Sequence, residues 1–251
     1  MLASKQQATP NKANHARTGL DVRGTGLQYN IASSTINMYT PSHFREDRIE
    51  VMSELMRLHP LAALVTIGPD GMDANHVPLI YDSEPAPFGT LLGHLAKANR
   101  QWRSWRPDLG ALAIFQGPQA YISPSLYPSK AEHGQVVPTW NYAVVHAHAS
   151  LTIHEDPAWL LALVTRLTAS HEAAYATPWR VSDAPSDYVD GLLHGIVGIE
   201  LHIHKLEGKW KVSQNRNHAD RAGIISSFEA DGNQSAREMA HLIRAASGQT
   251  D

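Results

Sequence analysis

The sequence predicts an α+β protein in which an antiparallel β-barrel carries helices at its periphery and at its C-terminal end. Short runs with strand-like patterns follow one another with turn residues between them, as antiparallel strands do. One run, Val144 to Ile153, places apolar residues on one face and polar residues on the other, as expected of a half-buried strand. Helical spacing is confined to segments inserted between the strands or appended to them, which does not fit a parallel βαβ fold.

The elements are expected in a definite order. Apolar residues at helical spacing predict an amphipathic helix from Phe44 to His59, with Ser42 as its N-cap and Pro60 ending it. The Gly-Pro-Asp-Gly sequence at 68–71 is a strong turn signal between two strands. Strands are expected over 61–67, 75–81, 90–95, 109–116, 119–122, 144–153 and 196–206. Further helices are expected over 157–174, 186–193, 217–228 and 235–246.

The composition is that of a folded protein without disulfides. The chain has 251 residues, of which 43% are hydrophobic and 18% charged, and its formal net charge is −3. This charge leaves no overall basic field, so nucleic acid would have to be bound by a local patch. The absence of cysteine excludes disulfides, thiolate catalysis and thiolate zinc sites. No apolar run approaches the length of a membrane-spanning helix, so no membrane association and a cytoplasmic location are expected.

Residues 1–37 differ from the rest of the chain. They are polar, lack a sustained apolar period and carry four basic residues against the single acid Asp21. Such a segment buries too little apolar surface to offset its ordering entropy. We therefore predict a disordered leader or extension over 1–37 and one folded domain over 38–251. A basic, acid-poor organelle address is the alternative interpretation.

Two histidine pairs raise the question of a metal or haem site. His146 and His148, like His202 and His204, are two residues apart on predicted strands, so each pair shares one face. Imidazoles bind metals, but a site needs further ligands, and no HExxH motif accompanies either pair. A polar strand face explains both pairs as well. A haem with a single axial histidine also stays open.

One segment concentrates donors suited to a phosphate. His94 lies near the end of a predicted strand, Lys97 follows it, and Asn99 is a good helix N-cap. An imidazole, an ammonium and the amide groups at a helix start are what a phosphate dianion requires. Trp102, one turn further on, is placed to shield such a group. Capping and ordinary surface chemistry explain the same residues without a ligand.

Several longer motifs carry a family resemblance. They are MYTPSHF (38–44), GHLAKANRQW (93–102), FQGPQAYISPSLY (115–127), VPTWNY (137–142) with the following His146, and GIVGIELHIHKLEGKWKVSQN (195–215). In this order they closely resemble the PaiB-type FMN-binding negative transcriptional regulators. The resemblance implies an FMN-binding split β-barrel, the fold shared with pyridoxamine-phosphate oxidases and flavin reductases. It also implies a homodimer with FMN at the subunit interface.

The resemblance also implies roles for individual residues. The strand that contains Asn75, His76, Val77 and Pro78 would run beside the isoalloxazine ring. The ribityl phosphate would be met by His94, Lys97 and Asn99, with Trp102 covering or buttressing it. Thr139, Trp140 and Asn141 would line the site, and a second polar cluster near the ligand or the dimer seam would comprise Lys211, Ser213, Gln214 and Asn215. Leu126 stands where the family pattern leads us to expect a tryptophan, which weakens any stacking role there.

Three functions follow as hypotheses. The first, implied by the resemblance, is a negative transcriptional regulator that responds to FMN and acts through DNA or a protein partner. The second is a flavin-dependent oxidoreductase, because a bound isoalloxazine performs redox chemistry. The third is a haem- or metal-binding split barrel that uses the histidine pairs. No helix-turn-helix with a basic recognition helix is found, and the best basic patch comprises Lys205, Lys209, Lys211, Arg216 and Arg221.

Overall fold

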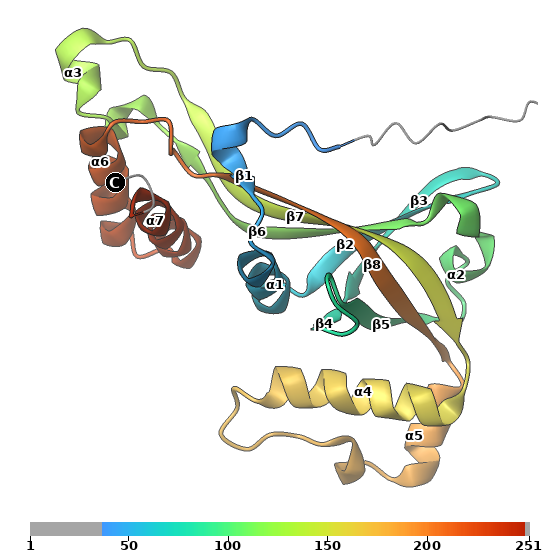
Figure 1. Cartoon of the computed structure of the whole chain (residues 1–251). Helices are drawn as coiled ribbons and strands as arrows, with labels where there is room; N and C mark the ends of the chain where they lie inside the picture. Colours follow the sequence, from blue (N-terminus) through green and yellow to red (C-terminus); the bar gives the residue numbers. More distant parts are fainter. Residues whose placement is uncertain (1–36, 249–251) are drawn as a thin grey trace, which may run out of the picture. The chain divides into compact units, whose positions relative to one another are not determined.

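The computed structural model describes residues 37–248, which contain one antiparallel sheet with seven α-helices around it (Figure 1). The strand order is β3-β2-β6-β7-β8-β5-β4, with β1 added beside β8. The strands are β1 (Arg45–Glu46), β2 (Leu61–Gly68), β3 (Gly71–Pro78), β4 (Ile80–Asp82), β5 (Thr90–Ala96), β6 (Ala111–Ile122), β7 (Thr139–His154) and β8 (Ile196–Lys211). The predicted α+β class with an antiparallel sheet is therefore confirmed. The expected leader, 1–37, lies outside the described residues except for Asn37.

The sheet curls into a barrel that is split between β3 and β5. These two strands are not neighbours in the hydrogen-bonded order, so the sheet does not close. They meet at Gly93, where an added Cβ would stand 2.7 Å from Cδ2 of Leu79 and 2.9 Å from the Pro78 carbonyl oxygen. Glycine is required for this close approach, because any side chain would push the two edges apart.

The core fills the inside of the curled sheet. Alternate residues of the long strands point inward and are almost fully buried, among them Leu64, Phe115, Val145 and Ile199. The alternation predicted for Val144 to Ile153 is confirmed, since Val145, Ala147 and Ala149 are buried. The two expected strands around Gly117-Pro118 form the single strand β6, because a β-bulge between Gln116 and Gln119 absorbs the turn-like sequence.

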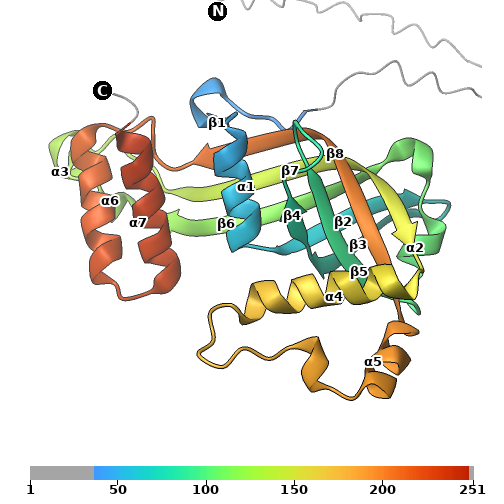
Figure 2. The ribbon, with the colours of Figure 1, turned by 60° about the horizontal axis from the view of Figure 1, so that its bottom comes forward.

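The helices lie at the periphery and at the C-terminal end, as predicted. They are α1 (Ile49–Leu58), α2 (Gln101–Ser104), α3 (Ser129–His133), α4 (Pro157–Glu172), α5 (Ser186–Leu193), α6 (His218–Ala230) and α7 (Gln234–Ser247). Figure 2 shows α6 and α7 side by side at one end of the sheet, with α4 and α5 apart from them. None of the helices in residues 37–248 is long and apolar enough to cross a bilayer.

The first helix begins later than predicted. Ser42 starts a short 3₁₀ turn, Arg45 and Glu46 pair with β8, and α1 starts only at Ile49. Arg48 donates from its backbone and its guanidinium to the Glu46 carboxylate, at 2.9 and 2.8 Å. Burial alone would raise the pKa of Glu46, but these bonds outweigh it and hold that pKa below its usual value. The tertiary pairing with β8 thus overrides the helical pattern of residues 44–48.

Candidate functional site

The outer face of the sheet carries several of the predicted site residues. Strand registers place one residue from each of five neighbouring strands in a continuous row: His76, Ala63, Ile114, His146 and Glu207. Adjacent strands lie about 4.8 Å apart, so this row spans about 19 Å. The face that contains His76 is therefore the same face that contains His146.

This outer face is apolar and exposed over β2, β3, β6 and the start of β7. Five large hydrophobic side chains on this face are exposed to solvent: Leu61, Ile67, Met72, Tyr121 and Trp140. Alternation along the strands places all five on the same side as His76. An apolar patch of this kind marks an interaction or ligand site.

A groove of about 620 Å³ crosses this face between the N-terminal segment and β6–β7. Tyr39, Trp140 and Tyr142 line it together with His146 and Lys209. The Lys209 ammonium lies 5.7 Å from the centre of the Tyr39 ring and 5.5 Å from that of Tyr142. The indole N–H of Trp140 donates to Oε1 of Gln119 at 3.0 Å. The groove thus offers flat aromatic walls beside a cation.

Lys211 extends the cationic end of this region. Its ammonium donates to the Thr139 hydroxyl and, at 2.6 Å, to the Trp140 carbonyl oxygen. Burial, reinforced by Lys209 and Arg216, lowers the pKa of Lys211. Within residues 37–248, no carboxylate lies within ion-pair distance of Lys209, Lys211 or Arg216. Three cations without an acidic partner favour the binding of an anion or an electron-rich group.

Other predicted residues shape the end of β7 and β8 rather than face the groove. Asn141 is buried and donates from Nδ2 to Oγ of Ser213 at 2.8 Å, while its Oδ1 has no hydrogen-bond partner. Ser213 adopts a φ of 64°, a left-handed backbone conformation that is uncommon outside glycine. Gln214 accepts from the Val212 N–H at 2.8 Å and donates to the Trp210 carbonyl at 2.6 Å. These contacts fix the turn that positions Lys211.

The second predicted cluster lies at the other end of β8. His94 pairs in register with Gly198, which in turn pairs with His154. The Trp159 ring rests on Gly198, 2.1 Å from where a Cβ would stand, and stacks on the His154 ring at 4.0 Å. His94 is half-buried beside this contact, its Nδ1 has no hydrogen-bond partner, and burial lowers its pKa. His94 is therefore a neutral imidazole with an unused ring nitrogen.

Lys97 and its neighbours form a tight turn after β5. The Lys97 ammonium lies 3.1 Å from the Glu155 carboxylate, so it already has an acidic partner. The indole of Trp102 is buried and donates to the Lys97 carbonyl at 3.1 Å, which makes Trp102 a buttress of the turn. Oδ1 of Asn99 accepts from the Gln101 N–H at 2.9 Å. Asn99 is nevertheless not the N-cap predicted: the cap is Arg100, and α2 has only four residues.

The remaining predicted residues lie on β3. His76 and Pro78 are exposed on the outer face, and Val77 points into the core. An added Cβ at Gly93 would stand 3.4 Å from Cγ1 of Val77, so this end of β3 and the His94 strand are in direct contact. The structure thus brings Val77 and the Pro78 backbone against Gly93, next to His94, and leaves the Lys211 cluster elsewhere.

The two clusters are far apart in one chain. Gly198, opposite His94, and Lys211 are thirteen residues apart on the single strand β8. A strand rises about 3.3 Å per residue, so these positions lie about 40 Å apart along β8. No small ligand contacts both clusters of the same chain.

The histidine pairs lie in ion-pair networks. Nε2 of His148 contacts the Glu207 carboxylate at 2.7 Å, and His202 lies 3.7 Å from Glu200. A β-bulge at His204 interrupts the alternation expected for the second pair. In the part of the chain that the structure describes, no three histidine or acidic side chains gather as metal ligands.

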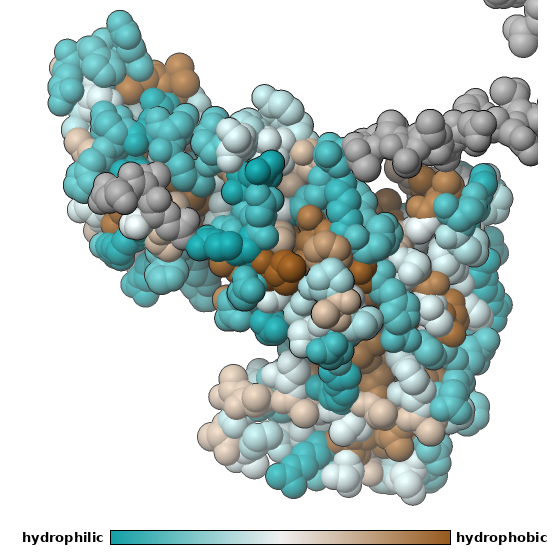
Figure 3. All heavy atoms as spheres, viewed as in Figure 1, coloured by the Kyte–Doolittle hydropathy of each residue, from teal (hydrophilic) through white to brown (hydrophobic). Residues whose placement is uncertain are grey.

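Two residues of the site, Tyr142 and Glu155, escaped sequence reasoning, and Lys209 was assigned only to the basic patch. Tyr142 and Lys209 share the outer face with Trp140 and Lys211, so strand alternation was a signal that could have found them. Glu155 has no signal in the sequence, because its contact with Lys97 depends on how β7 and β8 meet. A different groove, of about 790 Å³, lies between α1 and α7, where Figure 3 shows an apolar patch among hydrophilic residues. It contains none of the predicted site residues.

Comparison with known proteins gives consistent matches. A family model described as "Putative FMN-binding domain" matches residues 38–205. An uncharacterized protein of Emericella nidulans is 32% identical over 242 residues, covering 82% of this chain and 96% of that protein. Protease synthase and sporulation protein PAI 2 of Bacillus subtilis is 29% identical over 206 residues, covering 82% of this chain and 96% of that protein. Among solved structures, the flavocytochrome Anf3 from Azotobacter vinelandii covers 71% of this chain and 75% of its own, at 10% identity and a TM-score of 0.49.

The likeness to solved structures is too weak to support a function. The sequence matches, by contrast, are strong enough to show the family. The family model spans most of residues 37–248 and contains the motifs at 38–44, 93–102, 115–127 and 137–142 and the first part of the motif at 195–215. FMN is the cofactor of that family, so the cofactor expected from the sequence is confirmed. The chain belongs to the PaiB-type family of FMN-binding proteins.

Proposed function

We propose that this protein binds FMN between two copies of the chain. The observation that carries the proposal is the exposed apolar face of β2, β3, β6 and β7, with its aromatic groove and its unpaired cations. In this arrangement one copy supplies the groove and Lys211, and the other supplies the His94–Lys97 turn. Two copies are required because the two clusters of a single chain lie about 40 Å apart, farther than FMN reaches.

The residues present fit the two ends of the cofactor. The isoalloxazine ring is flat and apolar over its faces, which suits the walls formed by Tyr39, Trp140 and Tyr142. Its carbonyl edge accepts hydrogen bonds, which suits the ammonium of Lys211. The phosphate is a dianion, which suits Lys97 together with the unused ring nitrogen of His94. When bound, FMN supplies one- and two-electron redox chemistry.

The homodimer explains why the outer face is apolar. A two-fold interface uses the same patch on both copies, so the exposed face of one copy would be covered by the same face of the other. His76 and Pro78 on β3 belong to this face and would run beside the ring. Without a second copy, the apolar surfaces of Met72 and Trp140 would stay exposed to water, which is unfavourable in free energy.

The biological output that we propose is negative transcriptional regulation that responds to FMN. Its support is the family and the relative named for protease synthase and sporulation. Three members of the basic patch are already engaged: Lys205 contacts Glu207, Lys209 lies in the groove, and Nε of Arg221 is buried. We therefore propose a protein partner ahead of direct DNA binding.

A second candidate function is a flavin-dependent oxidoreductase. It is favoured by the groove, which is open to solvent and would leave one side of a bound ring accessible to a substrate. NAD(P)H oxidation by the purified protein tests this function, and DNA binding measured over a range of salt concentrations tests direct regulation.

The experiment that tests FMN binding is titration of the purified protein with FMN, followed by flavin fluorescence and by light scattering. We expect saturable quenching of FMN fluorescence. In the same sample, light scattering should report a particle with twice the mass of one chain, which is 27.6 kDa. Binding by a monomer would refute the two-copy arrangement. Absence of binding would refute the whole proposal, and a haem spectrum of the protein as isolated would favour the haem alternative.

A further inference from the structure

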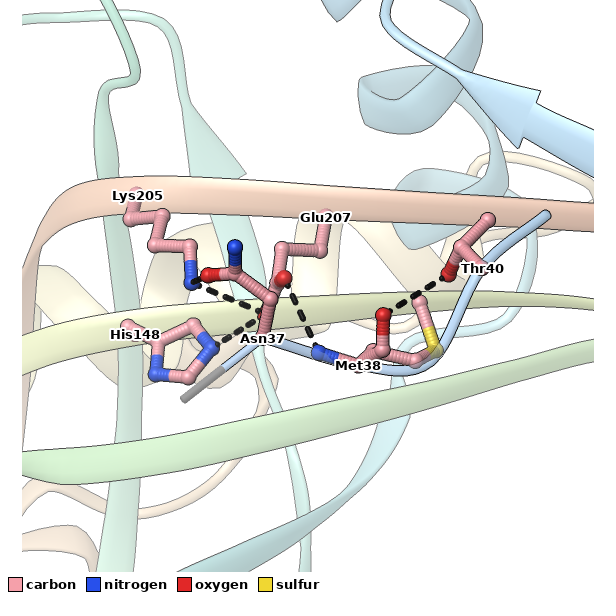
Figure 4. Close-up of polar contacts among 6 residues, drawn as sticks. All are labelled: Asn37, Met38, Thr40, His148, Lys205 and Glu207. Atoms are coloured by element: carbon pink, nitrogen blue, oxygen red, sulfur yellow. Dashed lines mark hydrogen bonds and ion pairs between the residues drawn. The ribbon is translucent and has the colours of Figure 1, made fainter. Parts of the chain in front are cut away.

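The segment from Asn37 to Thr40 crosses the outer face of β8 and forms one wall of the aromatic groove (Figure 4). Met38 and Tyr39 both line the groove, and Tyr39 is 83% exposed. These four residues belong to none of the described strands, since pairing with β8 begins only at Arg45. We name this segment, residues 37–40, the strap.

Glu207 is the centre of the contacts that hold the strap. Its Oε1 accepts the backbone N–H of Met38 at 3.1 Å. Its Oε2 lies 2.7 Å from Nε2 of His148 and 3.2 Å from the Lys205 ammonium. Lys205 in turn donates to Oδ1 of Asn37 at 2.5 Å. One carboxylate, held by two side chains of the sheet, therefore fixes the backbone of the strap.

The charge of Glu207 is stabilised where it stands. Burial alone would raise the pKa of this carboxyl, but hydrogen bonds from His148 and Lys205 outweigh burial and hold the pKa below its usual value. The carboxyl is therefore ionised at neutral pH and makes a charge-assisted bond to the strap.

Lys209 connects the strap to the groove. Its ammonium donates to the Tyr39 carbonyl at 2.9 Å and lies within about 6 Å of the ring centres of both Tyr39 and Tyr142, at 5.7 and 5.5 Å. The position of the Tyr39 ring thus depends on the same segment that Glu207 anchors. When the strap leaves β8, the groove loses its Tyr39 wall and Lys209 loses a partner.

We propose that the strap is a movable wall of the flavin site and that Glu207 is the positioning residue that holds it closed. The inference rests on the proposed binding of the isoalloxazine ring in this groove. If only the closed form binds the ring, the apparent affinity falls by the fraction of molecules in which the strap is open. The coupling is reciprocal, so bound FMN must also hold the strap against the sheet.

The test uses the full chain and compares four variants. Glu207→Gln removes the charge that anchors the strap, and Tyr39→Ala removes only the exposed ring, which keeps the test independent of folding. Glu200→Gln is the matched control, because Glu200 makes an equivalent contact with His154, at 2.6 Å on the same two strands, and does not touch the strap. Tyr39→Phe retains an aromatic wall and should behave as wild type.

Two readouts are used: chymotryptic cleavage after residue 39, for the variants that keep an aromatic residue there, and FMN affinity from flavin fluorescence, for every variant. We expect Glu207→Gln to be cleaved about tenfold faster and to bind FMN about three- to tenfold more weakly. Tyr39→Ala should weaken FMN binding. The flavin that still binds should be less quenched, because the Tyr39 ring no longer contacts it. In wild type, saturating FMN should slow cleavage, whereas Glu200→Gln should match wild type in the rate of cleavage.

The outcomes separate this inference from the proposed function. If wild type does not bind FMN, the proposed function fails. If wild type binds FMN but Glu207→Gln and Tyr39→Ala bind it equally well, the strap is not part of the site and the inference is overturned. Unchanged cleavage of Glu207→Gln would likewise overturn the role of Glu207 as the anchor.

Discussion

Lys97→Met removes the ammonium that we assign to the flavin phosphate and keeps a side chain of similar length. The magnitude follows from the exchange of partners at this position. A hydrogen bond from a charged group to the phosphate contributes about 1.5–3 kcal/mol. To make it, Lys97 gives up its pair with Glu155, and because Lys97 is 38% exposed that pair is worth only about 0–1 kcal/mol. The net loss in Lys97→Met is about 1–2 kcal/mol, or about five- to thirtyfold in the FMN dissociation constant.

The assay is a fluorescence titration of each variant with FMN and with riboflavin, which lacks the phosphate. Lys97→Met should weaken FMN by this factor and leave riboflavin unchanged. Lys211→Met, at the proposed ring edge, should weaken both flavins alike. Arg100→Met removes an exposed cation three residues from Lys97 and serves as the control for the general electrostatic field. Equal losses of FMN and riboflavin in Lys97→Met would refute the assignment of the phosphate to Lys97.

Four further predictions follow from the contacts described. Glu155→Gln should tighten FMN about two- to fivefold in the same titration, because it frees Lys97 and removes a carboxylate that repels the phosphate; weaker binding would contradict this. A chain that begins at Met38 should keep the melting temperature and FMN affinity of the full chain, because its new α-ammonium remains beside Glu207. A melting temperature lowered by many degrees would contradict this prediction. Met72→Asp, at a side chain that is 82% exposed, should leave the melting temperature of the monomer unchanged and dissociate the dimer in light scattering. The stability that Glu207 adds is fully present above the pKa of an unfolded glutamate and is lost as pH falls through the lowered pKa of the folded state. The difference in melting temperature between wild type and Glu207→Gln should therefore shrink as the pH is lowered below the ordinary glutamate pKa, and a constant difference would count against the ionised anchor.

Much of the fold could be predicted from local pattern. The alternation of β7 requires one buried and one open face whatever lies around it, and the helix at Ser186–Leu193 has the predicted bounds. The family and its cofactor were also accessible from the sequence, because the motifs at 93–102 and 195–215 are long and mixed in character. By contrast, residues 44–48 have a helical pattern but lie partly in β1, since pairing with β8 is a long-range contact.

The arrangement of the site was decided by tertiary structure. The resemblance placed the residues around His94 at the phosphate and those around Lys211 near the ligand or the dimer seam, and the structure holds the two groups at opposite ends of β8. The partners that set the chemistry, Glu155 for Lys97 and Glu207 for the strap, are 58 and 169 residues away in sequence from the groups they hold. Local sequence specifies which face of a strand a side chain takes, because that depends on alternation alone. Local sequence does not specify which distant residue contacts that side chain, because the contact depends on the order of the strands and on the register in which they pair.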